Sequence, residues 1–493
     1  MAVQNYLIFD FGASNGRGLV ANYDGSKFEF DVLHRFDNVP VYLAGTIYWD
    51  FLRLFSDLKA GLAFAAKKYK DIKSMGLDTW GVDFGIIDKN GALIANPVNY
   101  RDKHRNSMPA EVYKIISARE LQNLTGCALA SYYSIFNLYS LKIQDATEFN
   151  NAHKLLMMPD LFNYFLTGVA VNEYTDAHTS LMVNPFTAKW EPQILDRLGF
   201  PKDIFCEIIQ PSSKVGDIQK NVCSELDISP ISVIAPVTHD TPSAIAGIPV
   251  ADKSKNTVFM SIGTWGVNII ELNAPLISAE VFKTGFANEA GAAGKTLLFK
   301  NFVGMWLFQQ SREKWLKEVE GGLSWDDIMN LAKNTSTIKS FIDVDATEFV
   351  LAQADMPAMV REFCKKTGQK IPDSIGAIAR VIYESMALKV KHNLMDLEKI
   401  TGKRIDAMHM VGGGTKDVLL CQWMADATGL PVYAGPTETT SVGNLLMQLL
   451  AAGEIKDLDE GRQIALKSAS IKNYVPANTG YWNRIYEEFV KVI

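Results

Sequence analysis

A strand, a turn of small residues and a returning strand occur near the start of the chain and again near its middle. Residues 6–10 and 18–23 are predicted strands on either side of one glycine-containing turn, and residues 258–262 and 267–272 flank the other. Single hydrophobic cores stop growing at about 250–300 residues, so a chain of 493 residues is expected to contain more than one. The recurrence therefore predicts two related α/β halves.

Apolar spacing and turn residues predict the remaining elements. A hairpin turn is expected at Asp24-Gly25 and another at Asn90-Gly91. Further expected elements are a helix over 48–69, strands over 74–78, 231–237 and 407–411, a mainly helical region over 110–200, and a helix over 416–428 that stops at Gly429.

Charge and cysteine usage narrow the class of protein. The net charge is −6, so the chain offers no broad basic field to nucleic acid or to an anionic membrane. Five cysteines are scattered without short paired spacings, which argues against a zinc site or a disulfide scaffold. No apolar run approaches the ~18 residues of a membrane helix, and the first residues do not form a signal peptide. We expect a cytoplasmic enzyme with a small-molecule substrate, no nucleic acid and no membrane partner; monomer and homodimer both stay open.

Two glycine-containing turns are candidate phosphate sites. The first follows Asp10 and runs from Gly12 to Arg17, where small residues let backbone amides approach an anion and Asp10 can hold Mg²⁺ through water. The second contains Gly263 and Thr264, whose hydroxyl and exposed amides suit a terminal phosphate. The first turn alone is equally well explained as an ordinary hairpin, and for the second turn alone the ordinary hairpin is the favoured interpretation. Two such turns in related halves are more specific.

Three successive glycines form a third candidate. Gly412, Gly413 and Gly414 lie between a predicted strand and a predicted helix. Without side chains, this backbone can lie against a flat base or a phosphate. A strand-to-helix connection alone needs fewer glycines, so the triplet favours nucleotide binding.

Asp240 is the candidate general base. Phosphoryl transfer to a hydroxyl needs a carboxylate that orients the hydroxyl and accepts its proton. Asp240 lies between a strand and a helix whose dipole should keep it ionised, with Pro242 as the first helical residue. Asp240 or Thr241 can instead cap this helix, and a cap by Thr241 leaves Asp240 free.

The segment from Asp78 to Asp83 is the candidate sugar site. It offers the aromatic face of Trp80, the accessible Gly81 and two carboxylates to a molecule rich in hydroxyls. Both carboxylates can also be turn or strand-edge residues, which is the favoured interpretation for Asp78 and an equal one for Asp83.

Together these stretches resemble the FGGY carbohydrate kinases, and within them the rhamnulokinase branch. The resemblance covers most of the chain in the same order. The motifs that carry it are D-F-G-A-S-N-G-R (10–17), D-T-W-G-V-D-F (78–84), Y-R-D (100–102), H-D-T (239–241), S-I-G-T-W (261–265), K-N-F-V-G-M-W-L-F-Q (300–309), V-G-G-G (411–414) and A-G-P-T-E (434–438).

The resemblance implies a fold of two actin-like, ribonuclease-H-like ATPase domains with a catalytic cleft between them. It places an N-terminal domain for sugar and the first phosphate loop at 1–243 and a nucleotide-binding C-terminal domain at 244–493. It implies ATP and Mg²⁺ as cofactors, with Asp240 as the base and Asp10 beside Mg²⁺. The implied nucleotide contacts are Ala13, Ser14, Asn15, Gly16, Arg17, Thr264, Gln309 and Gly413. The implied sugar contacts are Gly81, Asp83, His239, Thr241 and Asn301.

The function implied is phosphorylation of a 6-deoxyketohexose, L-rhamnulose to L-rhamnulose 1-phosphate. An L-fuculokinase on the same scaffold is the alternative, because the two ketoses differ only in hydroxyl stereochemistry. A sensor without turnover is a third hypothesis, which the presence of Asp240 disfavours.

Overall fold

The protein packs into two compact units. The computed structural model describes residues 3–250, 252, 254–350 and 355–493. Unit 1 comprises Met1–Ala251, Glu271–Leu298 and Glu438–Ser468, and unit 2 comprises Asp252–Ile270, Phe299–Thr437 and Ala469–Ile493. The units are thus assembled from separate stretches of chain, and the domain boundary expected after residue 243 stays a prediction.

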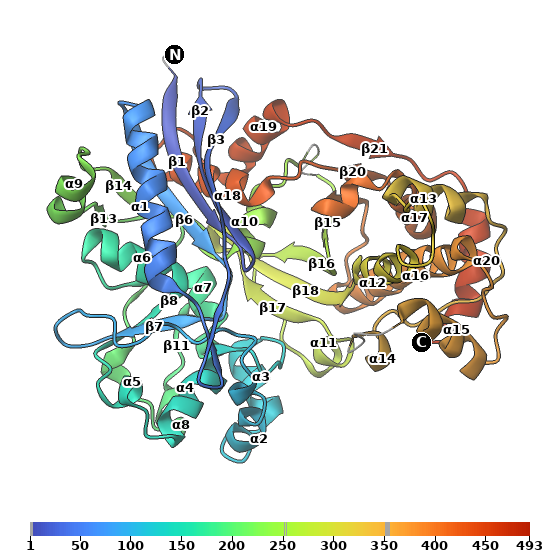
Figure 1. Ribbon diagram of the computed structural model, residues 1–493, viewed down its shortest axis with the longest axis horizontal. Helices are drawn as coiled ribbons and strands as arrows, with labels where there is room; N and C mark the ends of the chain where they lie inside the picture. Colours follow the sequence, from blue (N-terminus) through green and yellow to red (C-terminus); the bar gives the residue numbers. More distant parts are fainter. Residues whose placement is uncertain (1–2, 251, 253, 351–354) are drawn as a thin grey trace. The chain divides into compact units, whose positions relative to one another are not determined.

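Unit 1 is built on a six-stranded sheet in the order β13-β14-β6-β1-β2-β3 (Figure 1). The central strand β1 is parallel to β6 and antiparallel to β2. The strands of this sheet are β1 (Gln4–Phe11), β2 (Asn15–Tyr23), β3 (Phe28–Asp37), β6 (Ile72–Thr79), β13 (Ser213–Asp217) and β14 (Ser232–Ala235).

Helices cover both faces of this sheet, because successive side chains of a strand point to opposite sides. Leu7 and Phe9 of β1 belong to a core shared with α1 (Phe51–Lys68) and α6 (Met158–Thr167). Tyr6 and Ile8 belong to a second core shared with α18 (Thr439–Ala451) and α19 (Leu458–Ser468). Burial on both faces explains why β1 reads as a nearly continuous apolar run.

A third core fills the mainly helical region between β6 and β13. Phe84 and Leu155 from a β7–β8 pair pack there with residues of the surrounding helices. The elements are β7 (Phe84–Ile87), η1 (Lys103–Arg105), α2 (Met108–Val112), α3 (Ala118–Thr125), α4 (Ser134–Ile143), α5 (Thr147–Asn150), β8 (Lys154–Met157), β9 (Asn172–Glu173), α7 (Tyr174–His178), β10 (Val183–Asn184), β11 (Lys189–Trp190), α8 (Pro192–Leu198), η2 (Lys202–Ile204) and β12 (Ile208–Ile209).

Several smaller elements complete unit 1. They are β4 (Val41–Leu43), β5 (Thr46–Tyr48), α9 (Lys220–Leu226), α10 (Asp240–Ala246), α11 (Ala279–Lys283), β17 (Ala287–Ala290) and η3 (Ala292–Gly294).

Unit 2 repeats the sheet topology of unit 1. Its strands β16, β15, β19, β20 and β21 are neighbours in that order, and β18 lies beside β16. β15 is antiparallel to β16 and parallel to β19, as β1 is to β2 and β6. The bounds are β15 (Thr257–Ile262), β16 (Trp265–Leu272), β18 (Thr296–Val303), β19 (Ala407–Val411), β20 (Val432–Ala434) and β21 (Lys472–Tyr474). The expected relation between the two halves is therefore present at the level of strand order and direction.

The two candidate phosphate turns are also built alike. Gly12 N donates to Asn15 O at 2.9 Å, and Gly263 N donates to Trp265 O at 2.9 Å. A Cβ on Gly16 would lie 2.2 Å from the ring of Phe36, and one on Gly266 would lie 2.2 Å from the ring of Phe302. The glycine in each returning strand is thus required by an aromatic ring on the next strand.

The helices of unit 2 gather around the 27-residue α16. α12, α13, α17 and α20 pack against it. The bounds are α12 (Trp306–Trp315), α13 (Trp325–Asn334), α14 (Thr347–Val350), α15 (Met356–Lys366), α16 (Ile375–Thr401), η4 (Gly413–Lys416), α17 (Val418–Thr428) and α20 (Thr479–Phe489).

Most elements expected from the sequence are confirmed, with small differences at their ends. The helix expected over 48–69 is α1, which begins at Phe51 because Tyr48 belongs to β5. The last expected helix is α17, and it ends at Gly429, whose φ of 74° is left-handed. Within the described ranges, none of the helices has the length and apolarity to cross a bilayer.

Candidate active site

The end of β6 lies directly beside the segment that carries the predicted base. Thr79 N donates to Thr238 O at 2.8 Å, and Thr79 and His239 form a parallel bridge. This pairing brings the loop after β6 against the start of α10. A Cβ on Gly81 would lie 3.0 Å from His239 Nε2, so the glycine leaves the imidazole the room that it occupies. The structure thus brings the predicted residues Gly81, His239 and Asp240 together.

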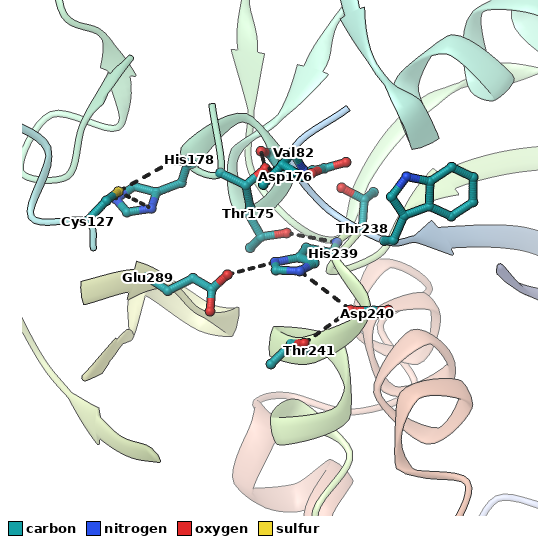
Figure 2. A network of polar contacts seen from close by, with 12 residues as sticks. Val82, Cys127, Thr175, Asp176, His178, Thr238, His239, Asp240, Thr241 and Glu289 are labelled. Carbon is teal, nitrogen blue, oxygen red and sulfur yellow. Dashed lines mark hydrogen bonds and ion pairs between the residues drawn. The ribbon is translucent and has the colours of Figure 1, made fainter. Parts of the chain in front are cut away.

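Asp240 begins α10 and faces His239 (Figure 2). His239 Nε2 lies 3.5 Å from Asp240 Oδ1, and the Thr241 hydroxyl donates to the same oxygen at 3.1 Å. The side chain of Asp240 keeps 32% of its surface exposed, so a ligand can reach it. Loss of surrounding water raises the pKa of Asp240, against the effect of His239, and Asp10 raises it further.

Two expectations for this segment are wrong. Neither Asp240 nor Thr241 caps α10, because His239 is the N-cap residue and makes no side-chain cap hydrogen bond. Pro242 lies in the first turn but is not the first helical residue, which is Asp240. Burial and Asp10 raise the pKa of Asp240, which is opposite to the effect of a helix dipole, and its ionisation stays a prediction.

His239 is held by a residue that the sequence did not single out. Its Nδ1 lies 2.8 Å from Glu289 Oε1 on β17, and both side chains are nearly buried. Burial by itself would lower the pKa of His239, but Glu289 outweighs it and raises this pKa to about 9, with Asp240 and Asp176 adding to the effect. His239 is therefore an imidazolium at neutral pH.

The loop after Gly81 is fixed from both sides. Val82 has a φ of 71°, in the left-handed region that a β-branched residue rarely adopts. Its N–H donates to Thr179 Oγ1 at 2.8 Å, and its carbonyl accepts from Ser134 Oγ at 2.7 Å. Strained backbone of this kind persists where its surroundings hold it, and it clusters at functional sites.

Asp83 is enclosed, with no exposed side-chain surface. Arg105 Nη2 donates to its Oδ1 at 2.7 Å, and Trp49 Nε1 and Trp80 Nε1 donate to its Oδ2 at 2.6 and 3.2 Å. Tyr100 N also donates to Oδ2, at 3.0 Å. A sugar contact by Asp83 stays a prediction; what the geometry supports is that this carboxylate positions Trp80 and the loop that contains Gly81.

A second group of carboxylates lies at the ends of β1 and β6. Asp10 Oδ2 accepts from Arg17 Nη2 at 2.6 Å and from Ser441 Oγ at 3.1 Å, and Arg17 also pairs with Glu438. Asp78 Oδ2 accepts from Asn444 at 2.6 Å. Burial raises the pKa of Asp78 well above its ordinary value, and repulsion by Asp10 adds to this effect.

This carboxylate group fits a hydrated divalent cation. Asp78 Oδ1 is buried and has no hydrogen-bond partner among the described residues. A cation would relieve the repulsion between Asp10 and Asp78, and Mg²⁺ prefers oxygen ligands and keeps several waters. Across the described ranges, no group of three or more His, Cys, Asp or Glu is placed to hold a metal directly.

The remaining predicted phosphate contacts lie in the turn between β1 and β2. Ser14 and Asn15 are exposed, Ala13 is half-buried and Gly16 is buried. The turn is tied down where Asn38 N donates to Ser14 O at 3.0 Å. The exposed residues Ser14 and Asn15 lie close in sequence to Arg17, whose guanidinium supplies a cation near the end of β1.

Unit 2 contains a cavity of about 420 Å³. This volume falls within the range of about 300–1,000 Å³ that is usual for small-molecule sites. The predicted residues Gln309 and Gly413 line the cavity, together with Gly263. Thr264 contacts this lining, because its hydroxyl donates to Gln309 Oε1 at 3.2 Å. Trp325, Met305, Met329 and Asp326 also line it, and the sequence did not indicate them. Apolar walls with a few polar groups suit a nucleoside.

Gly413 and Gly414 both line the cavity, but the packing around the three glycines of the triplet differs. Gly412 has a φ of 85°, and a Cβ there would lie 2.9 Å from Ile262 O. A Cβ on Gly414 would lie 2.4 Å from Ile262 Cγ2. A Cβ on Gly413 would meet no atom within 4 Å, so among these three glycines only Gly413 is free of a packing requirement.

Asn301 is the predicted sugar contact that the described geometry does not connect to the others. It is an exposed residue of β18 and belongs to unit 2, whereas Gly81, His239 and Asp240 belong to unit 1. Its role stays a prediction. The residues that sequence reasoning missed, Glu289, Thr179 and Arg105, reach the site from distant parts of the chain, and no short motif marks them.

Two units with the same sheet order, each with a glycine-containing turn between its first two strands, match the fold of sugar kinases, and the comparisons agree. Residues 5–247 match the N-terminal domain of the FGGY family of carbohydrate kinases, and residues 258–452 match its C-terminal domain. The chain belongs to this family. It is a sugar kinase, and the two-domain α/β fold expected from the sequence is confirmed.

Individual relatives cover nearly the full length. The chain is 35% identical over 486 residues to a rhamnulokinase of Bacteroides thetaiotaomicron, covering 99% of both chains. It is 34% identical over 475 residues to a rhamnulokinase of Halalkalibacterium halodurans, covering 96% of this chain and 99% of that one.

Among solved structures, a ligand-bound xylulose kinase from Lactobacillus acidophilus has a TM-score of 0.83 at 16% identity, over 99% of this chain and 97% of that one. Plasmodium falciparum glycerol kinase with ADP has a TM-score of 0.77 at 15% identity, over 99% and 98%. These two likenesses show the fold.

Proposed function

We propose that this protein transfers the γ-phosphoryl group of ATP to the hydroxyl on carbon 1 of L-rhamnulose, with Asp240 as general base. The observation that carries the proposal is the placement of Asp240. Its carboxylate is open to a ligand and lies next to the donors His239 and Thr241, and Gly81 leaves room for the His239 imidazole.

The reaction follows from these groups. The hydroxyl oxygen of carbon 1 attacks the γ-phosphorus, a new O–P bond forms, and the bond to the β–γ bridging oxygen breaks to release ADP. The hydroxyl proton passes to Asp240. Because the pKa of Asp240 is raised above its ordinary value, this carboxylate is a better proton acceptor than an exposed aspartate, and the adjacent His239 favours its ionised form.

The nucleotide is assigned to the cavity of unit 2 and to the two turns. Trp325, Met305 and Met329 offer an apolar face to the base, and Gly413 lets backbone approach it. Asp326 suits ribose hydroxyls. Thr264 and the exposed amides near Ser14, with Arg17, suit phosphate oxygens.

Mg²⁺ is assigned to Asp10 and Asp78, through water. When bound, the ion neutralises charge on the phosphate oxygens. The orphaned oxygen of Asp78 supports this assignment, and Arg17 holds Asp10 in a fixed orientation from the other side.

L-Rhamnulose is the proposed sugar because near-full-length relatives with 34–35% identity are rhamnulokinases. The test measures kcat/KM of the purified protein with Mg-ATP for L-rhamnulose, L-fuculose, L-ribulose, D-xylulose and glycerol, and locates the phosphate by ³¹P–¹H NMR. Highest kcat/KM for L-rhamnulose with a 1-phosphate product is expected. Highest kcat/KM for L-fuculose would change the proposed sugar from L-rhamnulose to L-fuculose and leave the proposed mechanism unchanged. Highest kcat/KM for glycerol or D-xylulose would refute the sugar assignment.

A further inference from the structure

Glu289, His239 and Asp240 form a row of three charged groups (Figure 2). Glu289 Oε1 lies 2.8 Å from Nδ1 of the imidazole, and Asp240 Oδ1 lies 3.5 Å from Nε2 on the other side of the ring. The imidazole therefore lies between two carboxylates from different parts of the chain. Asp240 is the proposed base. Glu289 is the less exposed of the two carboxylates, with 12% of its side-chain surface exposed.

The backbone next to Glu289 is firmly held. Asn288 N donates to Gly126 O at 2.8 Å, and the Asn288 side chain accepts from Leu276 N at 2.7 Å and donates to Leu276 O at 3.0 Å. β17 also packs against α7, which carries Asp176 and His178. A strand fixed at the preceding residue presents the Glu289 carboxylate to His239 with little freedom to move away.

Other charged and titratable groups face this row from the neighbouring elements. Asp176 and His178 face His239 from α7, and Cys127, Tyr132 and Tyr133 lie near Glu289. Asp10 of β1, Asp78 of β6 and Tyr100 lie near Asp240. Within the described residues, His239 is the cationic group that the structure places nearest to Asp240.

We propose that Glu289 is a positioning residue that keeps His239 protonated and turned toward Asp240, and so sets the pH range over which Asp240 can act as the base. This inference rests on the proposed function for its catalytic consequence. The imidazolium offsets the repulsion that Asp240 receives from Asp10. Glu289 offsets the cost of keeping that imidazolium in a site largely removed from water.

The sign of the effect follows from the geometry. Without the Glu289 charge, burial dominates and the pKa of His239 falls, so the imidazole becomes neutral near neutral pH. Asp240 then loses its adjacent cation while Asp10 and Asp78 remain. Its pKa rises, and a higher pH is needed to form the carboxylate. Glu289 thus acts on Asp240 through the imidazole and does not need to touch the substrate.

The first measurement is independent of activity. The full-length protein is labelled with ¹⁵N-histidine, the His239 signal is assigned with His239→Asn, and its titration midpoint is followed by NMR. A midpoint near 9 is expected for the native protein. A decrease of about two pH units is expected in Glu289→Gln, since charges at this distance move a pKa by about 1–3 units. Glu289→Asp should restore part of it, and Glu111→Gln, which removes the same charge at an exposed position, should leave it unchanged.

The second measurement is the pH profile of kcat/KM for the ketose that the wild type phosphorylates best. Glu289→Gln should move the acid limb to higher pH by about one unit, which is a loss of about tenfold below the limb, with much smaller loss above it. Damage to the fold would instead lower the rate at every pH and lower the Tm. Partial recovery of the limb in Glu289→Asp would identify the charge as the cause.

The outcomes separate the inference from the proposed function. If the native protein phosphorylates a ketose but both the His239 midpoint and the acid limb are the same in Glu289→Gln, the inference is overturned and the kinase assignment remains. A midpoint that falls without movement of the acid limb also overturns it. If no ketose is phosphorylated, the proposed substrate fails, and the NMR midpoint alone then supports or overturns the control of His239 by Glu289.

Discussion

Arg105→Ala should destabilise the protein, because it leaves Asp83 as a buried charge without its partner. It should also loosen the loop that contains Trp80 and Gly81. Both side chains are almost fully enclosed, at 1% and 0% exposure. Arg105 also donates to Val98 O at 2.7 Å and to Tyr132 O at 2.9 Å, so the substitution removes three contacts at once.

The magnitude follows from the burial of the pair. Removing one partner of a buried ion pair costs about 3–5 kcal/mol, because the remaining charge is desolvated and unpaired. At the ~2 °C per kcal/mol that applies to large domains, the Tm should fall by about 6–10 °C. Burial already raises the pKa of Asp83 against the effect of Arg105, so loss of Arg105 should raise this pKa further.

Differential scanning calorimetry and sugar kinetics together form the assay. Lys114→Ala removes one partner of an exposed pair and should leave the Tm within about 1 °C. The double variant Asp83→Asn/Arg105→Met should be more stable than Arg105→Met alone, since it removes the unpaired charge. KM for the sugar should rise in Arg105→Ala, because Trp80 and Gly81 lose their support.

Two results would refute this reasoning. A Tm of Arg105→Ala within 2 °C of the native protein would show that the buried pair is not needed for the fold. An Asp83→Asn variant that keeps the native Tm while its sugar KM rises tenfold would favour direct sugar binding by Asp83, as the sequence alone predicted.

The remaining predictions concern the proposed chemistry. Asp240→Asn should lower kcat by about 10²–10⁴-fold and leave the ATP affinity, measured by calorimetry, unchanged. The exposed control Asp196→Asn should keep native activity. Activity of Asp240→Asn within a few-fold of native would assign the base to another residue. Gly413→Val should weaken ATP binding at least tenfold and keep the native Tm, because a Cβ there meets no protein atom within 4 Å. Gly412→Val, by contrast, should lower the Tm. Native ATP affinity in Gly413→Val would show that the glycine triplet is not part of the nucleotide site. Chelation with EDTA should abolish turnover. The Tm should stay the same, since the described residues contain no cluster of three or more metal ligands. Activity that survives chelation would exclude the assignment of Mg²⁺ to Asp10 and Asp78.

The parts of the fold that sequence predicted are those set by local patterns. An apolar run ending at Asp10, followed by small residues, produces β1, the turn and β2, and the same pattern in residues 258–272 produces β15 and β16. Alternation and turn residues act over a few positions, so they are readable without tertiary information. The strand order common to both units then follows from repeating one local plan.

The parts that sequence could not supply depend on which side chains meet after folding. Glu289 lies 50 positions from His239, and its neighbours in the chain give no sign of a functional carboxylate. Asp83 looks like an available ligand in the sequence, but Trp49, Trp80 and Arg105 close around it. Motif letters give the type of residue and not the direction in which its side chain points.

The sequence was enough to nominate Asp240 as the proposed base, but it was not enough to predict how the surroundings shift its pKa. Its place after an apolar strand was enough to nominate it, because phosphoryl transfer needs one reachable carboxylate and the segment supplies one. The helix-start position was also expected to keep Asp240 ionised through the helix dipole, whereas burial and Asp10 act in the opposite direction and raise its pKa. α10 has only seven residues, and the protein around Asp240 replaces water on most sides while Asp10 adds negative charge. The imidazolium of His239 and the hydrogen bond from Thr241 counteract these effects at close range, and a carboxylate from β17 supports the charge of His239. The raised pKa of Asp240, the proposed base, is thus set by residues of β1, α10 and β17 together, which lie far apart in the sequence.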